Sequence, residues 1–453
     1  MNTYDVIIIG GGPGGYLAAD IIGKAGKKCL LIEKNVVGGV CLNEGCIPTK
    51  SILNAAKSYK SATQGEFLDN QDIKLKFNHK AVIAQKNETV KILVRGVEST
   101  LKKNKVKVLY AEAEIIARTE SGSVIRAGNI DYLANNLIIA SGSQSIIPPI
   151  AGVETLIGLG KILNSREILN ITEVPQNLVI VGGGYIGLEM ASYFNTAGSH
   201  VVIVEMEEHI AGTLDKEISN ILKEDMTSQG IVFYTSSRVI SISKDKVFCI
   251  NNGNNFELPY THVLLSAGRK PTFVKGTSVL GIKEESSGIF IDDTCRTNIN
   301  GVYALGDVTN KMMLAHVAYR QAEVVANNIL DHKDFIDYSA VPTVMYTQPE
   351  VGWVGLSEAE AVNQGYSYTA KKISINASGR HVIENGLTKG ICKLIIDDKR
   401  GVVIGGGLIG SYASEIIYTI SLIVHNKIPI ENLKNTIFPH PTVCEVIKEL
   451  IRA

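Results

Sequence analysis

A strand, a glycine-rich turn, a helix and an acid-ended strand follow one another at the start of the chain. An apolar strand over residues 4–9 leads into a helix through Gly10, Gly12 and Gly15. Such glycines permit a tight turn and a close approach of the backbone to a pyrophosphate, which the helix N-terminus binds. The next strand ends in Glu33, where a carboxylate accepts hydrogen bonds from ribose hydroxyls. The arrangement predicts a dinucleotide-binding unit.

The same arrangement recurs later in the chain. A strand over residues 177–181 leads into a turn with Gly182, Gly184 and Gly187, and the strand after the helix ends in Glu205. In both copies the acid falls 18 residues after the third glycine. Two units predict two dinucleotides, as in a flavoprotein that also uses a nicotinamide. Because Glu205 and the acids after it would repel a 2′-phosphate, NAD is favoured over NADP.

A third match tests how far the glycine pattern can be trusted. Gly405, Gly407 and Gly410 follow a short strand over residues 401–404 and precede a helix over 414–424. No acid-ended apolar strand follows them. The sequence therefore predicts a glycine-rich strand-to-helix turn in a domain that binds no nucleotide.

Composition excludes several classes of protein. Among 453 residues, Lys and Arg (45) balance Asp and Glu (45), so no basic field points to nucleic acid or an anionic membrane. Mean hydropathy is +0.13, yet no apolar run approaches the roughly 20 residues of a membrane span. Seven cysteines, an odd number, argue against a fully paired secreted protein. With no basic leader before the first strand, a cytoplasmic setting is expected, and no cysteine spacing predicts a metal site.

Two of these cysteines, Cys41 and Cys46, lie just after the first unit. Five residues of regular helix separate two Cα atoms by about 7.5 Å, whereas a disulfide needs roughly 4.4–6.8 Å. A bridge would require a distorted helix start, which Gly45 permits and Pro48 would help to frame. From the residues alone, a redox pair and two unrelated buried thiols remain equally open.

The fold class follows from these patterns: α/β, with two Rossmann-like dinucleotide-binding domains and a C-terminal α+β domain. Helical stretches are expected over residues 50–64 and 78–103, and a strand ending in Gly306-Asp307 is expected to return to the first domain. We place a first nucleotide-binding part, for FAD, at 1–148, a second, for NAD, at 149–270, a central part at 271–340 and the α+β domain at 341–453, which the family resemblance described below implies is a dimerisation domain.

Six motifs in a fixed order give the chain a resemblance to a known family. They are the two glycine units, Gly38-Gly39-Val40-Cys41-Leu42-Asn43-Glu44-Gly45-Cys46-Ile47-Pro48-Thr49-Lys50, Ala267-Gly268-Arg269-Lys270-Pro271, the segment 301–307, and His440-Pro441-Thr442-Val443-Cys444-Glu445. From end to end the chain resembles the pyridine nucleotide–disulfide oxidoreductases, and within them the lipoyl-oxidising enzymes most closely.

The resemblance implies a set of cofactor contacts. Glu33 would bind the adenosine ribose of FAD, Asp307 its flavin side, and Lys50, partnered by Glu189, would stabilise the reduced flavin. The FAD residues implied are Gly10, Gly12, Gly15, Glu33, Lys50, Ala113, Ser141, Gly142, Ser143, Asp307, Met313, Leu314, Ala315 and His316. The NAD residues implied are Gly182, Gly184, Tyr185, Ile186, Gly187, Glu205, Val239 and Gly268.

The resemblance also implies a catalytic set and partners. Cys41 and Cys46 would form a redox disulfide, with Cys41 exchanging with substrate and Cys46 facing the flavin. His440, oriented by Glu445, would be the general base. In this family the base comes from the other subunit, which implies a homodimer with composite sites. A lipoyl domain would be the macromolecular substrate.

The activity implied is oxidation of protein-bound dihydrolipoyl groups, with FAD as relay and NAD⁺ as acceptor. Such a flavoprotein serves 2-oxoacid dehydrogenase, acetoin dehydrogenase or glycine cleavage complexes. The alternative is an NAD(P)H-dependent reductase of low-molecular-weight disulfides, similar to glutathione reductase. Glu205, Leu42 and Ile47 favour the lipoyl subgroup.

Three residues near the implied site depart from the family pattern. Val40 replaces a common threonine, and Glu44 places a charge inside the redox loop, where it either raises the thiol pKa values or, as we favour, points to solvent. Cys444 is either a third reactive thiol or, as we favour, a small buried residue. The other cysteines, expected in the core, are Cys29, Cys249, Cys295 and Cys392.

Overall fold

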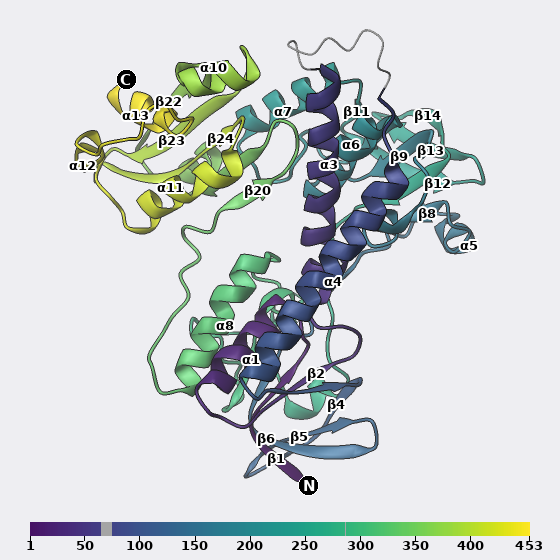
Figure 1. Ribbon diagram of the computed structural model, residues 1–453, viewed down its shortest axis with the longest axis vertical. Helices are drawn as coiled ribbons and strands as arrows, with labels where there is room; N and C mark the ends of the chain where they lie inside the picture. Colours follow the sequence, from purple (N-terminus) through teal and green to yellow (C-terminus); the bar gives the residue numbers. More distant parts are fainter. Residues whose placement is uncertain (65–74, 286) are drawn as a thin grey trace. The chain divides into compact units, whose positions relative to one another are not determined.

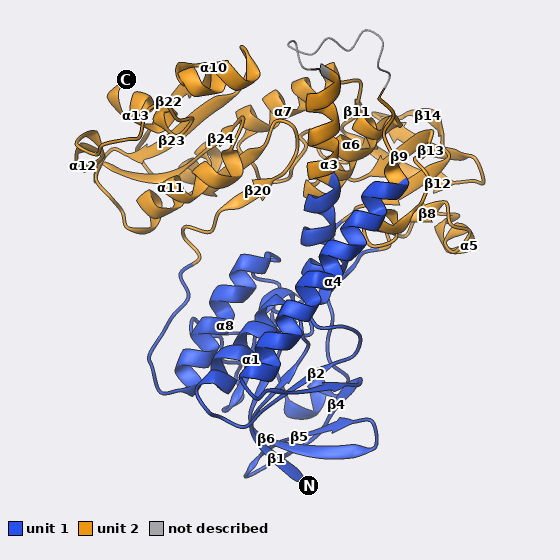
Figure 2. Cartoon of the chain, in the orientation of Figure 1, with its two compact units in different colours: residues 1–52, 80–146, 268–337 blue, residues 53–79, 147–267, 338–453 orange. Residues whose placement is uncertain are grey.

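The computed structural model describes residues 1–64, 75–285 and 287–453. The chain folds into two compact units (Figure 2). The first contains residues 1–52, 80–146 and 268–337, and the second contains residues 53–79, 147–267 and 338–453. Both are mixed α/β, which confirms the predicted fold class, while the limits given for the four domains remain a proposal.

A seven-stranded sheet forms the centre of the first unit, in the order β3-β2-β1-β6-β5-β4, with β19 paired to β6 (Figure 1). Its core strands are parallel, and β4 and β5 extend it as an antiparallel edge. The chain thus returns to its first sheet through β19. The strands are β1 (Asn2–Ile9), β2 (Cys29–Glu33), β3 (Lys107–Tyr110), β4 (Ala113–Thr119), β5 (Gly122–Ala127), β6 (Ile130–Ile139) and β19 (Val302–Ala304).

The apolar residues of β1 are buried because helices cover this sheet. Helix α1 (Pro13–Lys24) packs closely on α8 (Ala315–Ile329). A Cβ at Gly14 would lie 2.3 Å from Leu305 and 2.9 Å from the carbonyl of Ala318, so only glycine permits this approach. The approach sets the position of the α1 N-terminus.

Three helices follow the first glycine turn: α2 (Gly39–Glu44), α3 (Cys46–Gln64) and α4 (His79–Lys103). The last two confirm the predicted helical stretches to within a few residues at their ends. The break between α2 and α3 falls at Gly45, the residue between Glu44 and Cys46.

In the second unit, a five-stranded parallel sheet repeats the first pattern in the order β11-β10-β9-β15-β8. A three-stranded antiparallel sheet, β12-β13-β14, follows β11 in the chain. The elements are β8 (Ile162–Leu163), β9 (Asn177–Val181), α6 (Tyr185–Ala197), β10 (His200–Val204), α7 (Lys216–Ser228), β11 (Val232–Tyr234), β12 (Ser237–Ile242), β13 (Lys246–Asn251), β14 (Asn254–Pro259) and β15 (His262–Leu265).

The C-terminal part of this unit is an antiparallel sheet, β20-β21-β24-β23-β22, with helices between and after its strands. Its core is formed by β23, β24, α11 and α13. The elements are β20 (Thr343–Met345), β21 (Val351–Gly355), α9 (Glu358–Asn363), β22 (Tyr368–Ser374), α10 (Gly379–Asn385), β23 (Ile391–Asp397), β24 (Val402–Ile409), α11 (Ala413–His425), α12 (Ile430–Lys434) and α13 (Glu445–Arg452).

The third glycine match is not the turn that the sequence predicted. Gly405 and Gly407 lie inside β24, a fully buried strand that continues to Ile409, and only Gly410 is at the turn before α11. A Cβ at Gly405 would lie 1.9 Å from the carbonyl oxygen of Leu356. A Cβ at Gly407 would lie 2.2 Å from that of Gly352. These glycines therefore serve the close approach of neighbouring backbone.

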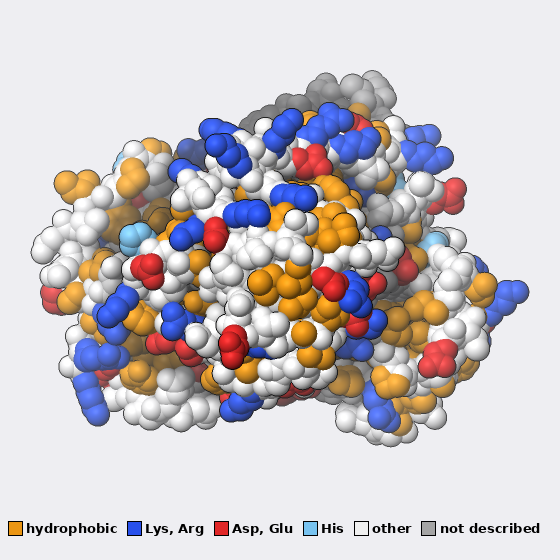
Figure 3. All heavy atoms as spheres, turned by 90° about the horizontal axis from the view of Figure 1, so that it is seen from below, with side chains coloured by type: hydrophobic (Ala, Val, Ile, Leu, Met, Phe, Trp, Pro, Cys, Tyr) orange, Lys and Arg blue, Asp and Glu red, His pale blue; other side chains and the backbone are white. Residues whose placement is uncertain are grey.

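Short elements complete the fold: β7 (Ser143–Ser145), α5 (Val153–Leu156), β16 (Arg269–Pro271), β17 (Glu284–Glu285) and β18 (Gly288–Ile289). On the face drawn in Figure 3, Lys and Arg side chains stand among acidic and apolar ones. Across the described ranges, no helix has the length and apolar character needed to cross a membrane.

Candidate active site

The turn between β1 and α1 has the geometry of a phosphate cradle. Gly10 has φ +107°, and a Cβ there would lie 2.2 Å from the carbonyl oxygen of Ala140. A Cβ at Gly15 would lie 1.9 Å from the carbonyl oxygen of Gly10. Gly12 precedes α1, and within the described residues no side chain caps that helix. Backbone amides at this end can therefore bind an anion.

Glu33 is fixed against this turn. One carboxylate oxygen accepts a hydrogen bond from the amide of Gly11 at 2.6 Å, and the other accepts from the amide of Asn35 at 2.8 Å. The side chain is buried at the end of β2. The carboxylate is thus held beside the glycine turn, where the predicted ribose contact requires it.

The second turn repeats this geometry. Gly182 has φ +106°, and a Cβ at Gly187 would lie 2.2 Å from the carbonyl oxygen of Gly182. Glu205 accepts from the amide of Gly183 at 2.6 Å and from that of Glu207 at 2.8 Å. The two glycine units therefore share the same backbone approach and the same hydrogen bond between the acid and the turn amide.

A polar cluster connects three distant segments of the first unit. Ser143 donates a hydrogen bond to the carboxylate of Asp307. Arg269 donates from Nε to the Ser143 hydroxyl and from Nη2 to the Ser143 carbonyl, both at 2.8 Å. Ser141 donates to the carbonyl of Thr272 at 2.5 Å. With Gly142 at φ +72°, these contacts fix the loop after β6 beside Asp307.

Most of the other predicted cofactor residues lie at the N-terminal ends of two helices and within two strands. Leu314 directly precedes α8, with Met313 before it and Ala315 and His316 opening the helix. Tyr185 and Ile186 open α6, while Ala113 and Val239 are buried in β4 and β12. Gly268 falls in the first unit, not with the second glycine turn.

Cys41 and Cys46 form a disulfide. Cys41 lies in α2 and Cys46 is the first residue of α3, and the break at Gly45 brings their Cα atoms to 4.6 Å. A continuous helix would separate the two atoms by about 7.5 Å. Of the two interpretations of this pair, the structure supports the bridged one, with the distorted helix start that the sequence required.

Glu44, inside this loop, is half-buried. Burial lowers the pKa of the Arg269 guanidinium, whereas the carboxylates of Asp307 and Glu44 oppose that change. The charge of Glu44 thus acts on Arg269, while the favoured expectation that its side chain points to solvent stays a prediction.

Lys50 lies one turn after Cys46 in α3. Glu189, its expected partner, is buried in α6 and accepts a hydrogen bond from the amide of Tyr346 at 3.0 Å. The two residues belong to different compact units, so their pairing stays a prediction.

His440 and Glu445 form a close pair at the C-terminus. His440 Nδ1 lies 3.0 Å and 3.1 Å from the two carboxylate oxygens of Glu445. Glu445 also accepts from the amide of Thr442 at 2.9 Å. That amide, and then His440, lower the pKa of Glu445. Because the carboxylate faces Nδ1, that nitrogen carries the hydrogen and Nε2 is left to accept a proton.

The remaining cysteines differ from this pair. Burial raises the pKa of Cys29, Cys295 and Cys392 to about 12 and that of Cys249 to about 11. All four are in the core, as predicted. Cys444 packs on the C-terminal core, with Sγ 3.9 Å from Thr419 Oγ1, and burial raises its pKa. This environment favours the interpretation of Cys444 as an inert packed residue.

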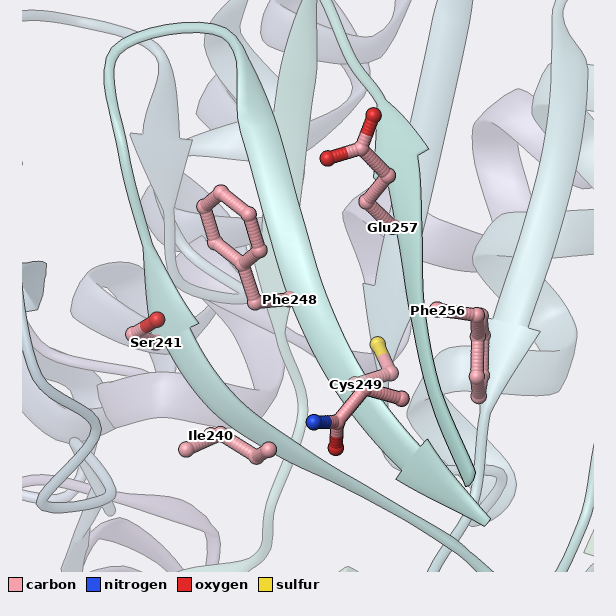
Figure 4. Close-up of a pocket in the computed structure, with 7 residues that line it drawn as sticks. Ile240, Ser241, Phe248, Cys249, Phe256 and Glu257 are labelled. Atoms are coloured by element: carbon pink, nitrogen blue, oxygen red, sulfur yellow. The ribbon is translucent and has the colours of Figure 1, made fainter.

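A cavity of about 330 Å³ opens on the sheet β12-β13-β14 (Figure 4). Phe248 and Glu257 line it from neighbouring strands, together with Ile240 and Ser241. None of the predicted site residues is among the described residues that line it. The predicted site residues lie at the glycine turns, the disulfide and the His440–Glu445 pair, and not in this cavity.

Comparisons with known proteins match two successive regions of the chain. Residues 4–322 match the family described as pyridine nucleotide-disulphide oxidoreductase, and residues 341–451 match the dimerisation domain of that family. The chain belongs to this family. It therefore combines the family's oxidoreductase region with its dimerisation domain.

Similar proteins support this placement over nearly the whole chain. A dihydrolipoyl dehydrogenase of Chlamydia muridarum is 36% identical, covering 99% of this chain and 96% of that protein. A dihydrolipoyl dehydrogenase of Geobacillus stearothermophilus is 33% identical, covering 98% and 95%. Among solved structures, the Cu(II) complex of the HOCl-induced flavoprotein disulfide reductase RclA from Escherichia coli has a TM-score of 0.88 at 27% identity, covering 100% and 99%. LpdA from Mycobacterium tuberculosis has a TM-score of 0.89 at 23% identity, covering 100% and 99%, which shows the shared fold.

FAD and NAD are the cofactors of this family, and the residues present fit them. In each turn the first and third glycines lie against neighbouring backbone. A Cβ at the second glycine, Gly12 or Gly184, would have, apart from its chain neighbours, no atom of the described residues nearer than 4.0 Å, which leaves this side of the turn open for a pyrophosphate. Each turn also carries a carboxylate placed for ribose hydroxyls, Glu33 in one and Glu205 in the other. Glu205 and the acidic residues after it fit NAD better than NADP.

The sequence did not predict two groups that hold site residues in place. Arg269 lies in one of the family motifs, but its hydrogen bond to Ser143 was not predicted because the two residues are 126 positions apart. The Thr442 amide, which binds Glu445, carries no side-chain signal at all. Such contacts become visible only when the chain is folded.

Proposed function

We propose that the protein is a dihydrolipoyl dehydrogenase. It oxidises dihydrolipoyl groups to the cyclic lipoyl disulfide and reduces NAD⁺ to NADH. Its substrate is the lipoyl domain of a 2-oxoacid dehydrogenase, acetoin dehydrogenase or glycine cleavage complex. Relatives with this name cover nearly all of the chain.

One observation carries the proposal: the chain holds both a disulfide and a histidine–carboxylate pair suited to accept a thiol proton. The Cys41–Cys46 bridge accepts two electrons, and His440 Nε2 accepts the proton. Thiol–disulfide exchange requires a thiolate attacker, so a base beside the substrate thiol accelerates it.

The exchange proceeds in two balanced steps. His440 takes the proton of one dihydrolipoyl thiol, whose sulfur attacks Cys41, breaking the bond to Cys46, which leaves as a thiolate. The second lipoyl thiol then loses its proton and attacks its partner sulfur in the mixed disulfide. The cyclic lipoyl disulfide is released, and Cys41 takes up a proton. The substrate has lost two electrons and two protons. One proton is now on Cys41 and the other on His440, and Cys46 remains a thiolate.

The remaining site residues position the cofactors. Bound FAD would supply two-electron transfer between the dithiol and NAD⁺. The first turn with Glu33 and the Ser141–Ser143 loop with Asp307 would bind FAD, and the second turn with Glu205 would bind NAD. The Lys50 ammonium would place a positive charge at the flavin, with Glu189 as its counter-charge.

We further propose a homodimer in which His440 of one subunit serves the disulfide of the other. The dimerisation domain of this chain exposes large apolar side chains to solvent, and such exposed apolar surface is typical of a protein–protein interface. Ile437, three residues before His440, is 95% exposed. The other described ones are Val362, Ile383, Leu387, Tyr412, Tyr418 and Leu422. A cytoplasmic setting remains a proposal from the sequence.

A steady-state assay tests the function. Purified protein should form NADH from NAD⁺ and dihydrolipoamide, and Cys41→Ser should abolish that activity. The likeness to a disulfide reductase favours one alternative, the reduction of small disulfides. Robust NADPH-dependent reduction of glutathione disulfide, with no NADH formed from dihydrolipoamide, would replace the proposal by that alternative.

A further inference from the structure

A buried serine lies next to the His440–Glu445 pair in the hydrogen-bond network. The Ser378 hydroxyl donates to the carbonyl of Thr442 at 2.9 Å, and the Thr442 amide donates to Glu445 at 2.9 Å. Only 1% of Ser378 is exposed. The two contacts lie on either side of the Thr442 Cα atom, so Ser378 and Glu445 fix the same residue from opposite directions.

Ser378 is itself held in place by its neighbours. It precedes α10, and its hydroxyl accepts from the amide of His381 at 3.2 Å. The His381 ring is buried, with Nε2 2.9 Å from Thr388 Oγ1 and Nδ1 3.3 Å from Ser411 Oγ. With one hydrogen to donate, the Ser378 hydroxyl directs it to Thr442.

The position of Thr442 determines the state of Glu445. Its amide is the largest cause of the lowered pKa of Glu445, ahead of His440. A carboxylate that is displaced from this amide also loses its alignment with His440 Nδ1. Reactive geometry is sensitive to such displacement, because a misplacement of about 1 Å costs on the order of 10²-fold in rate.

We propose that Ser378 is a positioning residue for the reaction of the lipoyl thiol. It anchors Thr442, and through it keeps Glu445 and His440 aligned for proton transfer. Ser378 does not touch the substrate. The inference rests on the proposed function, because it assigns His440 the role of base.

The test compares two serine variants in the full-length holoenzyme. Ser378→Ala removes the bond to Thr442. The control is Ser374, an exposed residue just before the short helix Ile375–Ala377, whose hydroxyl accepts a hydrogen bond from the amide of Asn376. For Ser378→Ala we expect kcat/KM for dihydrolipoamide to fall about tenfold, the scale of one lost buried hydrogen bond. Reduction of ferricyanide by NADH should stay within about twofold of wild type, since it bypasses the lipoyl thiol. Ser374→Ala should change neither rate, and Ser378→Thr should restore most of the loss.

A second readout keeps this inference separate from the proposed function. In protein with ¹³C-labelled histidine, the His440 ring signal, assigned with His440→Ala, should move in Ser378→Ala and stay in Ser374→Ala. This shift reports the contact with Glu445 whatever the substrate. An unchanged signal with unchanged dihydrolipoamide kinetics, or an equal loss of both activities, would overturn the role of Ser378. A moved signal in a protein whose wild type fails to oxidise dihydrolipoamide would instead refute the proposed function alone.

Discussion

The imidazole of His440 faces the carboxylate of Glu445, with Nδ1 3.0 Å from Oε1 and 3.1 Å from Oε2. The carboxylate is largely buried and the imidazole is 79% exposed. A fixed acid therefore orients a ring whose other nitrogen is accessible, which is the arrangement that a general base for an external thiol requires.

Replacing this ring should separate the two halves of the reaction. His440→Ala should lower the rate of dihydrolipoamide oxidation by about 10²–10⁴-fold, the usual contribution of a general base. Ferricyanide reduction by NADH should change little. His332→Ala removes an exposed ring elsewhere and serves as the control. Equal losses of both activities in His440→Ala would contradict the assignment.

Cys444 should prove chemically silent. Its sulfur packs on the C-terminal core near Thr419, and burial raises its pKa, so little thiolate forms near neutral pH. Cys444→Ser should therefore leave turnover and sensitivity to peroxide unchanged. A variant that resists oxidation markedly better than wild type would revive the hypothesis of a third reactive thiol.

A buried ion cluster should contribute to stability. Lys393 is 3% exposed and lies 3.1 Å from Asp215 and 3.2 Å from Glu217, with Glu358 also in contact. Asp215 in turn caps α7. Removing one partner of a buried ion pair costs about 3–5 kcal/mol, because the other charge is left uncompensated. Lys393→Met should clearly lower the thermal unfolding midpoint.

The matched control is Lys372, which pairs with Glu217 at 2.6 Å but is 59% exposed. An exposed pair contributes about 0–1 kcal/mol. Lys372→Met should barely move the midpoint. Similar midpoints for the two lysine variants would show that the Lys393 cluster is not stabilising.

Acid should remove the contribution that one ion pair in the first unit makes to the stability of the fold. Arg320 donates two hydrogen bonds to Asp334, at 2.9 Å and 2.5 Å. They are the largest cause of the lowered pKa of Asp334, which falls from 3.8 to about 2. Since the folded pKa is below the unfolded one, the pair stabilises above about pH 4, and the stabilisation is lost as the pH falls from 3.8 toward 2.

Unfolding midpoints of wild type and Asp334→Asn should therefore differ at pH 6, and the difference should shrink below pH 4. Asp331→Asn changes an exposed carboxylate nearby and serves as the control. A difference that stays constant or grows on acidification would contradict the account.

The sequence predicted the features that depend on short spacing. Both glycine turns, the acids that end the next strands and the helix break around Gly45 follow from residues close together in the chain. Glu33 and Glu205 were identified in this way, although their bonds to the turn amides became visible only in the structure.

Features that depend on distant neighbours could not be predicted. Gly405 and Gly407 have the same spacing as the nucleotide turns, yet they lie inside β24, because backbone from residues 352–356 presses against them. The charge of Glu44 acts on Arg269, and nothing near Glu44 in the sequence indicates this effect. Ser378 and Thr442 are 64 positions apart, and although Thr442 lies in the motif that contains His440, Ser378 belongs to no recognisable pattern.

The central claim is that the Cys41–Cys46 disulfide passes electrons from a lipoyl dithiol to NAD⁺. Rapid alkylation followed by mass spectrometry measures this directly. The five other cysteines should be unbridged throughout, whereas Cys41 and Cys46 should become alkylatable after anaerobic dihydrolipoamide and unreactive again after NAD⁺. A disulfide that stays closed with dihydrolipoamide, or a dithiol that NAD⁺ fails to reoxidise, would contradict the account.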